Sequence, residues 1–332
     1  MHHITAQEYI DGIIANNKKL LAKSITIIES SLSKHQTTAQ TIISTIMPRT
    51  GKSIRVGITG VPGVGKSSFI EKLGLLLVKN GYRVAVLAVD PSSSVSGGSI
   101  LADKTRMEQL AAEPNAFIRP SPSSSHLGGV ARKTRETMLV CEAAGYDVIL
   151  IETVGVGQSE TTVASMVDFF LILMLPNAGD ELQGIKKGVL ELVDAVVINK
   201  ADTDNTEQAM LAKKIYETAF HIITPGSPNW NPPIMTCSAL ENRGVEEIWR
   251  KIIEHNTTLK ETGELEKKRT SQSVDWMNSL LEEMIKNYFF NIDVVKEKIA
   301  KAQNMVCRKA ISPAEAAESI FQTILSSSPN NN

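Results

Sequence analysis

The stretch 60-GVPGVGKSS-68 decides the fold of this chain. It fits the pattern G-x-x-x-x-G-K-[ST], and it lies between the apolar run 54-IRVGIT-59 and the predicted helix 68-SFIEKLGLLLVKNG-81. Glycines let backbone N–H groups converge on phosphate oxygens, and the helix that follows adds the positive end of its dipole. In this strand–loop–helix context, the motif predicts a P-loop that binds a nucleoside triphosphate.

The residues of this motif are the predicted phosphate-binding residues: Gly60, Val61, Pro62, Gly63, Val64, Gly65, Lys66, Ser67 and Ser68. We expect Lys66 to reach the β- and γ-phosphates and to stabilise the charge of the transition state, which makes it a predicted catalytic residue. We expect the Ser67 hydroxyl to ligate magnesium.

Apolar runs alternate with helical patterns on both sides of the motif. Besides residues 54–59, the predicted strands are 83-RVAVLAV-89, 146-YDVILIE-152, 168-DFFLILML-175, 194-DAVVIN-199 and 233-PIMTCS-238. Continuous apolar strands are typical of a sheet that is covered on both faces. The sequence therefore predicts an α/β fold of the P-loop NTPase type, with a mostly parallel, doubly wound sheet.

Helical extensions flank this central region. We expect a helical N-terminal extension over residues 1–50, the P-loop domain over 51–260 and a helical C-terminal segment over 261–332. Apolar residues recur at helical spacing from Ile10 to Leu32. Such a stripe could line a cofactor groove, but we interpret it as a face that packs against the next domain.

Composition excludes several classes of function. The 332 residues carry a net charge of −1 without a basic tract, so nothing favours a nucleic-acid or membrane-surface partner. The three cysteines lie far apart, which indicates neither a disulfide framework nor a cysteine metal cluster. The N-terminus lacks an apolar signal core, and the run 169-FFLILMLP-176 is too short to span a bilayer. We therefore expect a cytoplasmic protein.

The run 194-DAVVINKAD-202 places Asn-Lys-x-Asp directly after a strand. The two carboxylate oxygens of Asp202 suit the adjacent N1–H and 2-amino donors of guanine, whereas adenine presents an acceptor at N1. We expect Lys200 to lie along the base and Asn199 to brace the loops. Alone, this motif could be any polar turn, but its position after the P-loop predicts GTP or GDP as the ligand.

A second loop, 237-CSAL-240, resembles the segment of GTP-binding proteins whose backbone N–H contacts guanine O6. Ser238, Ala239 and Leu240 are therefore predicted base-binding residues.

The segment 152-ETVGVGQSE-160 follows a buried strand and brings Glu152 and Gly155 to its carboxyl end. We expect Glu152 to hold magnesium through a water and the Gly155 N–H to sense the γ-phosphate, and both are predicted catalytic residues. Ser67, Asp90, Asp103 and Glu152 together form the predicted Mg²⁺ shell. Asp103 could instead cap a helix, and Asp90 could only form a turn before Pro91.

Val156 stands where Ras-like enzymes carry the glutamine that orients the attacking water. Gln158 is the nearest substitute. We therefore predict slow intrinsic hydrolysis of GTP.

Four stretches, 57-GITGVPGVGKSSFIEKL-73, 86-VLAVDPSSSVSGGSILADKTRM-107, 150-LIETVGVGQSE-160 and 198-INKAD-202, closely resemble the MeaB/ArgK family of GTPases. The resemblance covers nearly the whole chain. It implies a homodimeric GTPase chaperone that gates cofactor loading and protects an adenosylcobalamin-dependent methylmalonyl-CoA mutase or a related acyl-CoA mutase.

The resemblance also implies roles for two other segments. The family's additional switch matches 177-NAGDELQGIKKG-188, so Asp180, Gln183 and Lys186 would report the nucleotide state to the mutase. The C-terminal arm, with its apolar face from Val274 to Ile285, would contribute to the dimer. Arg132 and Lys133 could face the nucleotide or the partner, or could belong to a solvated helix start.

Two alternatives remain open at this point. A nickel-insertion GTPase shares the Glu-x-x-Gly motif but needs metal ligands near the nucleotide, and the histidines here are scattered without pairing to cysteine. A kinase linked to amino-acid transport needs an acceptor pocket and a base, and the sequence shows no such constellation.

Overall fold

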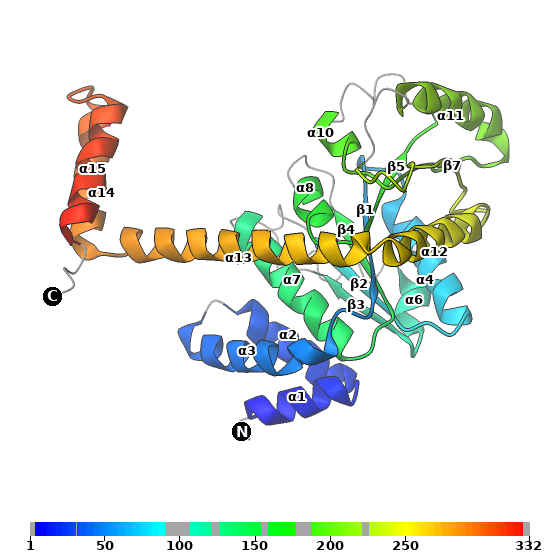
Figure 1. The fold of residues 1–332 in the computed structure, drawn as a ribbon, viewed down its shortest axis with the longest axis horizontal. Coiled ribbons are helices and arrows are strands. Elements are labelled where there is room, and N and C mark those ends of the chain that lie inside the picture. Colours follow the sequence, from blue (N-terminus) through cyan, green and yellow to red (C-terminus); the bar gives the residue numbers. More distant parts are fainter. Residues whose placement is uncertain are drawn as a thin grey trace. The chain divides into compact units, whose positions relative to one another are not determined.

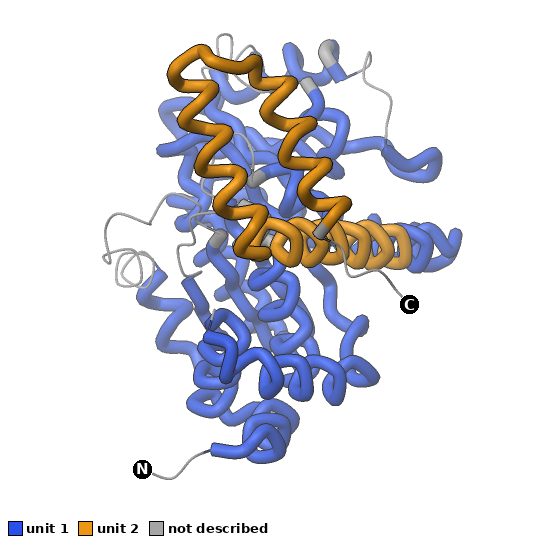
Figure 2. Tube along the Cα trace, turned by 90° about the vertical axis from the view of Figure 1, so that its left-hand side faces the viewer, with its two compact units in different colours: residues 1–268 blue, residues 269–332 orange. Residues whose placement is uncertain are grey.

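The computed structural model describes residues 4–30, 32–89, 107–120, 127–153, 159–176, 187–220 and 226–327. These residues form two compact units, Met1–Lys268 and Arg269–Asn332. Figure 2 distinguishes the units by colour.

The first unit is built on a seven-stranded sheet with the order β3-β2-β4-β1-β5-β6-β7, and all its pairings are parallel (Figure 1). The strands are β1 (Ile54–Gly60), β2 (Val84–Val89), β3 (Ala116–Pro120), β4 (Val148–Thr153), β5 (Phe169–Met174), β6 (Ala195–Ile198) and β7 (Ile234–Thr236). This sheet confirms the predicted doubly wound α/β fold.

Strand β3 is absent from the sequence-based prediction. It is a short edge strand whose sequence, 116-AFIRP-120, contains an arginine and ends in proline. Proline is tolerated at a sheet edge, where its missing N–H breaks no central ladder. The short and interrupted apolar run explains why its pattern did not indicate a strand.

Helices cover both faces of the sheet, and the central strands β1, β4 and β5 are buried along almost their whole length. One face packs on α4 (Lys66–Lys79), α6 (Glu108–Ala112) and α12 (Val245–Glu261). The other packs on α7 (Leu127–Ala143), α8 (Ser159–Ala164), α10 (Lys187–Leu190) and α11 (Thr206–Phe220). A 3-10 turn, η3 (Thr203–Asn205), precedes α11.

The N-terminal helices belong to the same unit as the sheet. They are α1 (Ala6–Ile14), α2 (Lys18–Glu29) and α3 (Ser33–Ile46), followed by the 3-10 turn η1 (Met47–Arg49). All three pack on α7 (Figure 1). Their apolar stripe, which includes Ile13, Leu21 and Ile25, joins one hydrophobic core with α7 and the sheet. The stripe is thus a packing face.

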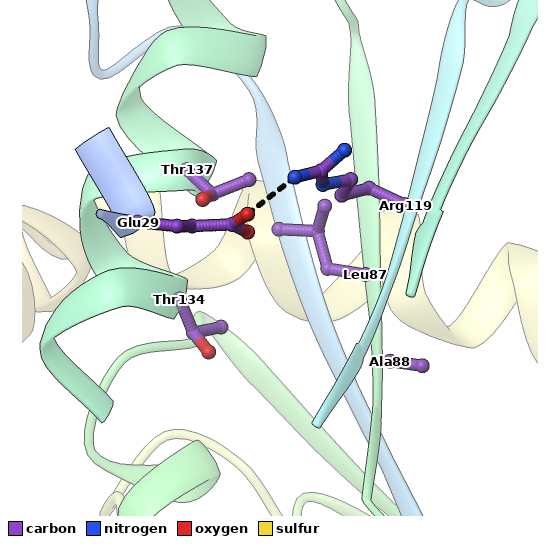
Figure 3. A pocket seen from close by; sticks show the side chains of 6 residues that line it. All are labelled: Glu29, Leu87, Ala88, Arg119, Thr134 and Thr137. Carbon is purple, nitrogen blue, oxygen red and sulfur yellow. Dashed lines mark hydrogen bonds and ion pairs between the residues drawn. The ribbon is translucent and has the colours of Figure 1, made fainter. Parts of the chain in front are cut away.

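Polar contacts also fix α2 to the edge strand β3 at both ends. At one end, the Nζ of Lys18 donates to the carbonyl oxygen of Ala116 over 2.7 Å. At the other, the guanidinium of Arg119 pairs with the Glu29 carboxylate beside a small cavity (Figure 3). Leu87, Ala88, Thr134 and Thr137 complete the cavity lining. These two contacts tie helix α2 to strand β3 near both ends of the helix.

The remaining helices are α13 (Glu264–Phe290), α14 (Asp293–Cys307) and α15 (Pro313–Ser327). Within the second unit, α14 and α15 pack against each other. Val295, Ala302 and Ala316 are buried on these two helices. None of the helices in the described ranges combines the length and apolar character that a membrane span requires.

Candidate functional site

The predicted phosphate-binding loop connects β1 to α4. Gly60, Gly63 and Gly65 have φ values of 149°, 81° and 93°, which L side chains rarely adopt. A Cβ on Gly60 would lie 2.4 Å from the carbonyl oxygen of Leu173, and one on Gly65 would lie 2.8 Å from Nδ2 of Asn199. Gly60 and Gly65 are therefore required both for their conformation and for the space around them.

Helix α4 begins at Lys66, directly after this loop. The first N–H groups of a helix have no partner within the helix, so the end of α4 suits an anion. Pro62, Gly63 and Ser68 are exposed at this end, whereas Val64 is buried in the core.

The Lys66 side chain is buried against the loop. Its Nζ donates to the carbonyl oxygens of Gly60 (2.7 Å) and Val61 (3.2 Å). Burial lowers the pKa of Lys66, and the carboxylates of Glu152 and Glu160 act in the opposite direction. The ammonium group thus contacts two loop carbonyls and lies within electrostatic reach of two carboxylates.

Ser67 and Glu152 meet beside Lys66. The Ser67 hydroxyl donates to Oε1 of Glu152 over 3.0 Å. Glu152 is buried near the carboxyl end of β4 and lies opposite Ile58 in the register with β1. A hydroxyl and a carboxylate are the oxygen ligands that Mg²⁺ accepts together with water and phosphate. The two side chains therefore fit a magnesium ion, although in the described ranges no three His, Cys, Asp or Glu side chains form a metal-binding group.

Asn199 links the phosphate loop to the predicted base loops. Its Nδ2 donates to the carbonyl oxygen of Val64 (2.8 Å), and its Oδ1 accepts from the backbone N–H of Ala239 (3.2 Å). The thiol of Cys237 also donates to this Oδ1, over 3.3 Å. Because Asn199 is buried and all three contacts are internal, it holds the loops at one end of the sheet together.

Asp202 and Ser238 face each other across these loops. The Ser238 hydroxyl donates to Oδ1 of Asp202 over 2.5 Å. Lys200 is exposed and has a φ of 59°, in the left-handed region. The Leu240 side chain is 81% exposed, while Ala239 is buried. The carboxylate of Asp202 thus has a defined position at the carboxyl end of the parallel strands, where the phosphate loop also lies.

Several predicted site residues lie outside the described residues. They are Asp90, Asp103, Gly155, Val156, Gln158, Asp180, Gln183 and Lys186. Their assignments stay predictions.

Two further predictions concern charged and histidine side chains. Arg132 pairs with Glu136 through Nε and Oε1 at 3.0 Å on the surface of α7.

His255 is buried between the rings of Phe169 and Trp230, near Asp194, which precedes β6. It therefore lies at the amino end of the strands, opposite the phosphate loop.

Sequence reasoning missed three charged residues at the site. Glu160 is buried on α8 and acts electrostatically on Lys66. Glu241 and Arg243 form an ion pair beside the base loops, at 2.8 Å. In the sequence, these residues could have been found only by their proximity to known motifs. Glu160 ends the switch segment 152–160, and Glu241 and Arg243 follow shortly after Ser238.

A family model described as "Methylmalonyl Co-A mutase-associated GTPase MeaB" matches residues 21–293. The chain belongs to the MeaB family. This confirms the resemblance and, together with the P-loop fold, makes the chain a P-loop GTPase that acts on guanine nucleotides.

Other MeaB-type proteins are similar over most of their length. Escherichia coli "GTPase ArgK" is 50% identical over 290 residues, which cover 87% of this chain and 88% of that protein. The mouse protein "Methylmalonic aciduria type A homolog, mitochondrial" is 41% identical over 334 residues, covering 96% of this chain and 80% of that protein. A crystal structure described as a LAO/AO transport system kinase has 40% identity and a TM-score of 0.77, with 98% and 99% of the two chains covered.

Proposed function

We propose that this GTPase is a chaperone for an adenosylcobalamin-dependent methylmalonyl-CoA mutase or a related acyl-CoA mutase. It would gate cofactor loading and protect the mutase from inactivation, with GTP binding and hydrolysis as the switch. The observation that carries the proposal is the match to a family described as mutase-associated over residues 21–293. The 41% identity to a methylmalonic aciduria type A homolog supports it.

The phosphate end of the site supplies the groups that hydrolysis needs. The Lys66 ammonium stabilises negative charge on the β- and γ-phosphates as the bond to the leaving group breaks. Ser67 and Glu152, with Asp90 and Asp103, would hold a magnesium ion that neutralises charge on the phosphate oxygens. The Gly155 N–H would respond to the γ-phosphate. The Ser67–Glu152 contact at 3.0 Å supports this assignment.

The base end selects guanine. Asp202 would accept hydrogen bonds from N1–H and the 2-amino group, Lys200 would lie along the base, and the 238–240 loop would contact O6. The carboxylate of Asp202 and the backbone of Ala239 lie on loops that Asn199 and Ser238 connect, which supports a shared base pocket.

The remaining parts of the proposal concern partners. Asp180, Gln183 and Lys186 would signal the nucleotide state to the mutase, and the C-terminal helices would form a homodimer in the cytoplasm. Exposed apolar side chains along α13, such as Met277, Leu281 and Met284, support a protein contact there.

GTP turnover by the purified chain, alone and with an adenosylcobalamin-dependent methylmalonyl-CoA mutase, tests the function. Alone, we expect a rate on the order of 10⁻⁴–10⁻² s⁻¹, the range of switch GTPases without an activating partner. The mutase should raise it strongly. If the mutase leaves turnover unchanged while GTP still binds tightly, the assignment as a GTPase stands and the mutase is rejected as its partner.

A transport-linked kinase is the second candidate, and it rests on the description of the similar crystal structure. The same preparation with γ-labelled GTP distinguishes the two. Label that appears only in free phosphate supports the switch, whereas label on a protein or amino acid supports the kinase.

A further inference from the structure

Two charged side chains hold the backbone on both sides of Asp202. Nη2 of Arg243 donates to the carbonyl oxygen of Ala201 over 2.6 Å. Oε1 of Glu241 accepts from the backbone N–H (3.1 Å) and the hydroxyl (3.0 Å) of Thr203. The residues before and after Asp202 are therefore each tied to the 238–243 loop.

The same two side chains are tied to each other and to Ser238. Oε2 of Glu241 lies 2.8 Å from Nη2 of Arg243. The backbones of Ser238 and Arg243 exchange two hydrogen bonds of 3.0 Å. The Ser238 hydroxyl accepts from the backbone N–H of Glu241 (2.9 Å) while it donates to Asp202. The loop that contacts the carboxylate and the loop that carries it thus form one network.

The charge state of Glu241 suits this role. Hydrogen bonds from the backbone and the hydroxyl of Thr203 lower the pKa of Glu241, and Arg243 acts in the same direction. The side chain is therefore a carboxylate at neutral pH, when it accepts both bonds.

We propose that Glu241 and Arg243 are positioning residues for guanine recognition, which aim the Asp202 carboxylate by clamping the backbone on either side of it. The proposal rests on the assignment of Asp202 to the base. A carboxylate that must accept from two adjacent donors needs a narrow range of positions, so a small backbone shift should weaken both bonds. The side chains of Glu241 and Arg243 are 32% and 50% exposed, and such surface pairs contribute little to overall stability. Their effect should appear in base discrimination.

The test compares binding of GDP and inosine diphosphate by calorimetry. Inosine lacks the 2-amino group, so it offers Asp202 only one hydrogen bond. Glu241→Ala and Arg243→Ala should each weaken GDP binding about threefold to tenfold, the range for loss of one hydrogen bond, and weaken inosine diphosphate less. The preference for GDP over inosine diphosphate should therefore fall. If the two residues act as one clamp, the double variant should lose less free energy of GDP binding than the two single variants lose together.

Glu254→Ala is the matched control, because Glu254 forms an exposed ion pair with Lys251 at the same 2.8 Å on α12. It should change neither affinity. Glu241→Gln keeps an acceptor oxygen for Thr203 and should recover part of the preference. If an alanine variant does not fold, Glu241→Gln and Arg243→Lys replace it in the comparison of the two nucleotides. Equal weakening of both nucleotides, or no change in either, would overturn the proposal.

Asp202→Asn separates this proposal from the base assignment on which it rests. An amide side chain should shift the preference from guanine to xanthine nucleotides. If Asp202→Asn still prefers GDP as the parent does, the base assignment is wrong. If it shifts while the Glu241 and Arg243 variants discriminate normally, only the clamp is wrong.

Discussion

Gly60 shows how little freedom one residue of the phosphate loop has. Its φ of 149° is unfavourable for other residues. A Cβ at this position would also lie only 2.4 Å from the carbonyl oxygen of Leu173. The obstacle is backbone of the neighbouring strand β5, which cannot rotate away as a side chain can. Motif matching identifies the glycine, and the structure supplies the reason for it.

Gly60→Ala should therefore destabilise the chain more than Gly81→Ala. Gly81 also has a positive φ, of 87°, but a Cβ there would meet nothing within 4 Å. Alanine at a positive φ of this kind costs about 1–3 kcal/mol at either position, and the clash adds to this at Gly60. Thermal unfolding of both variants checks the prediction, and equal losses would contradict it.

Lys66→Ala should lose hydrolysis and most of the affinity for the triphosphate. We expect a decrease in turnover of about 100-fold or more, because the charge that develops on the phosphates loses its cation. Lys79→Ala is the control, since Lys79 is exposed in the last turn of the same helix. Single-turnover assays and GTP titrations measure both effects. Near-normal turnover in Lys66→Ala would exclude a catalytic role.

At the scale of elements, the attachment of α2 to β3 joins parts of the chain that are distant in sequence. Glu29 and Arg119 are 90 positions apart, yet they form an ion pair beside a small cavity (Figure 3). Burial raises the pKa of Glu29, and Arg119 and Lys133 only partly counteract it. The pair is thus a place where protonation and the stability of the N-terminal helices are linked.

The contribution of Glu29 to the free energy of unfolding should decrease as pH rises from the ordinary carboxyl pKa through the raised pKa of Glu29. The folded chain binds this proton more tightly than the unfolded chain, so protonation favours folding between the ordinary carboxyl pKa and the raised one. Glu29→Gln should remove this part of the pH dependence. Glu207→Gln, on the exposed side of α11, should keep the parental dependence. Thermal midpoints across acidic to neutral pH test this, and parallel curves for parent and Glu29→Gln would contradict it.

At the scale of the whole molecule, the second unit carries large apolar side chains in contact with solvent. On α13, Leu281 and Met284 are 53% and 65% exposed, and Tyr288 is exposed one turn further on. Exposed apolar faces of this kind are typical of surfaces that another protein covers. We have proposed a second copy of the chain as that protein.

Replacing both Leu281 and Met284 with lysine should therefore shift a dimer to monomer, since each charge would have to be buried in the contact. Glu282→Lys changes an exposed polar residue of the same helix and should leave the dimer intact. Sedimentation equilibrium at micromolar concentration measures the mass of each variant. A parent that is monomeric, or a double variant that stays dimeric, would reject this interface.

Much of the fold and part of the site were predictable because their signals are local. The strand–loop–helix around Lys66 and the Asn-Lys-x-Asp run at Asp202 each lie within a few consecutive residues. Strand β3 was not predictable in this way, because an edge strand needs less apolar sequence than a central one. The roles of Glu160, Glu241 and Arg243 also depend on neighbours that folding supplies.

By itself, the amino-acid sequence determined the nucleotide-binding motifs, the doubly wound sheet and the family, because residue type and spacing set backbone conformation and burial locally. Only the tertiary structure decided that all three N-terminal helices pack on α7, that Ser67 meets Glu152, and that an ion pair holds both neighbours of Asp202. Those contacts join segments that come close only when the parallel strands align and bring their carboxyl ends to one edge.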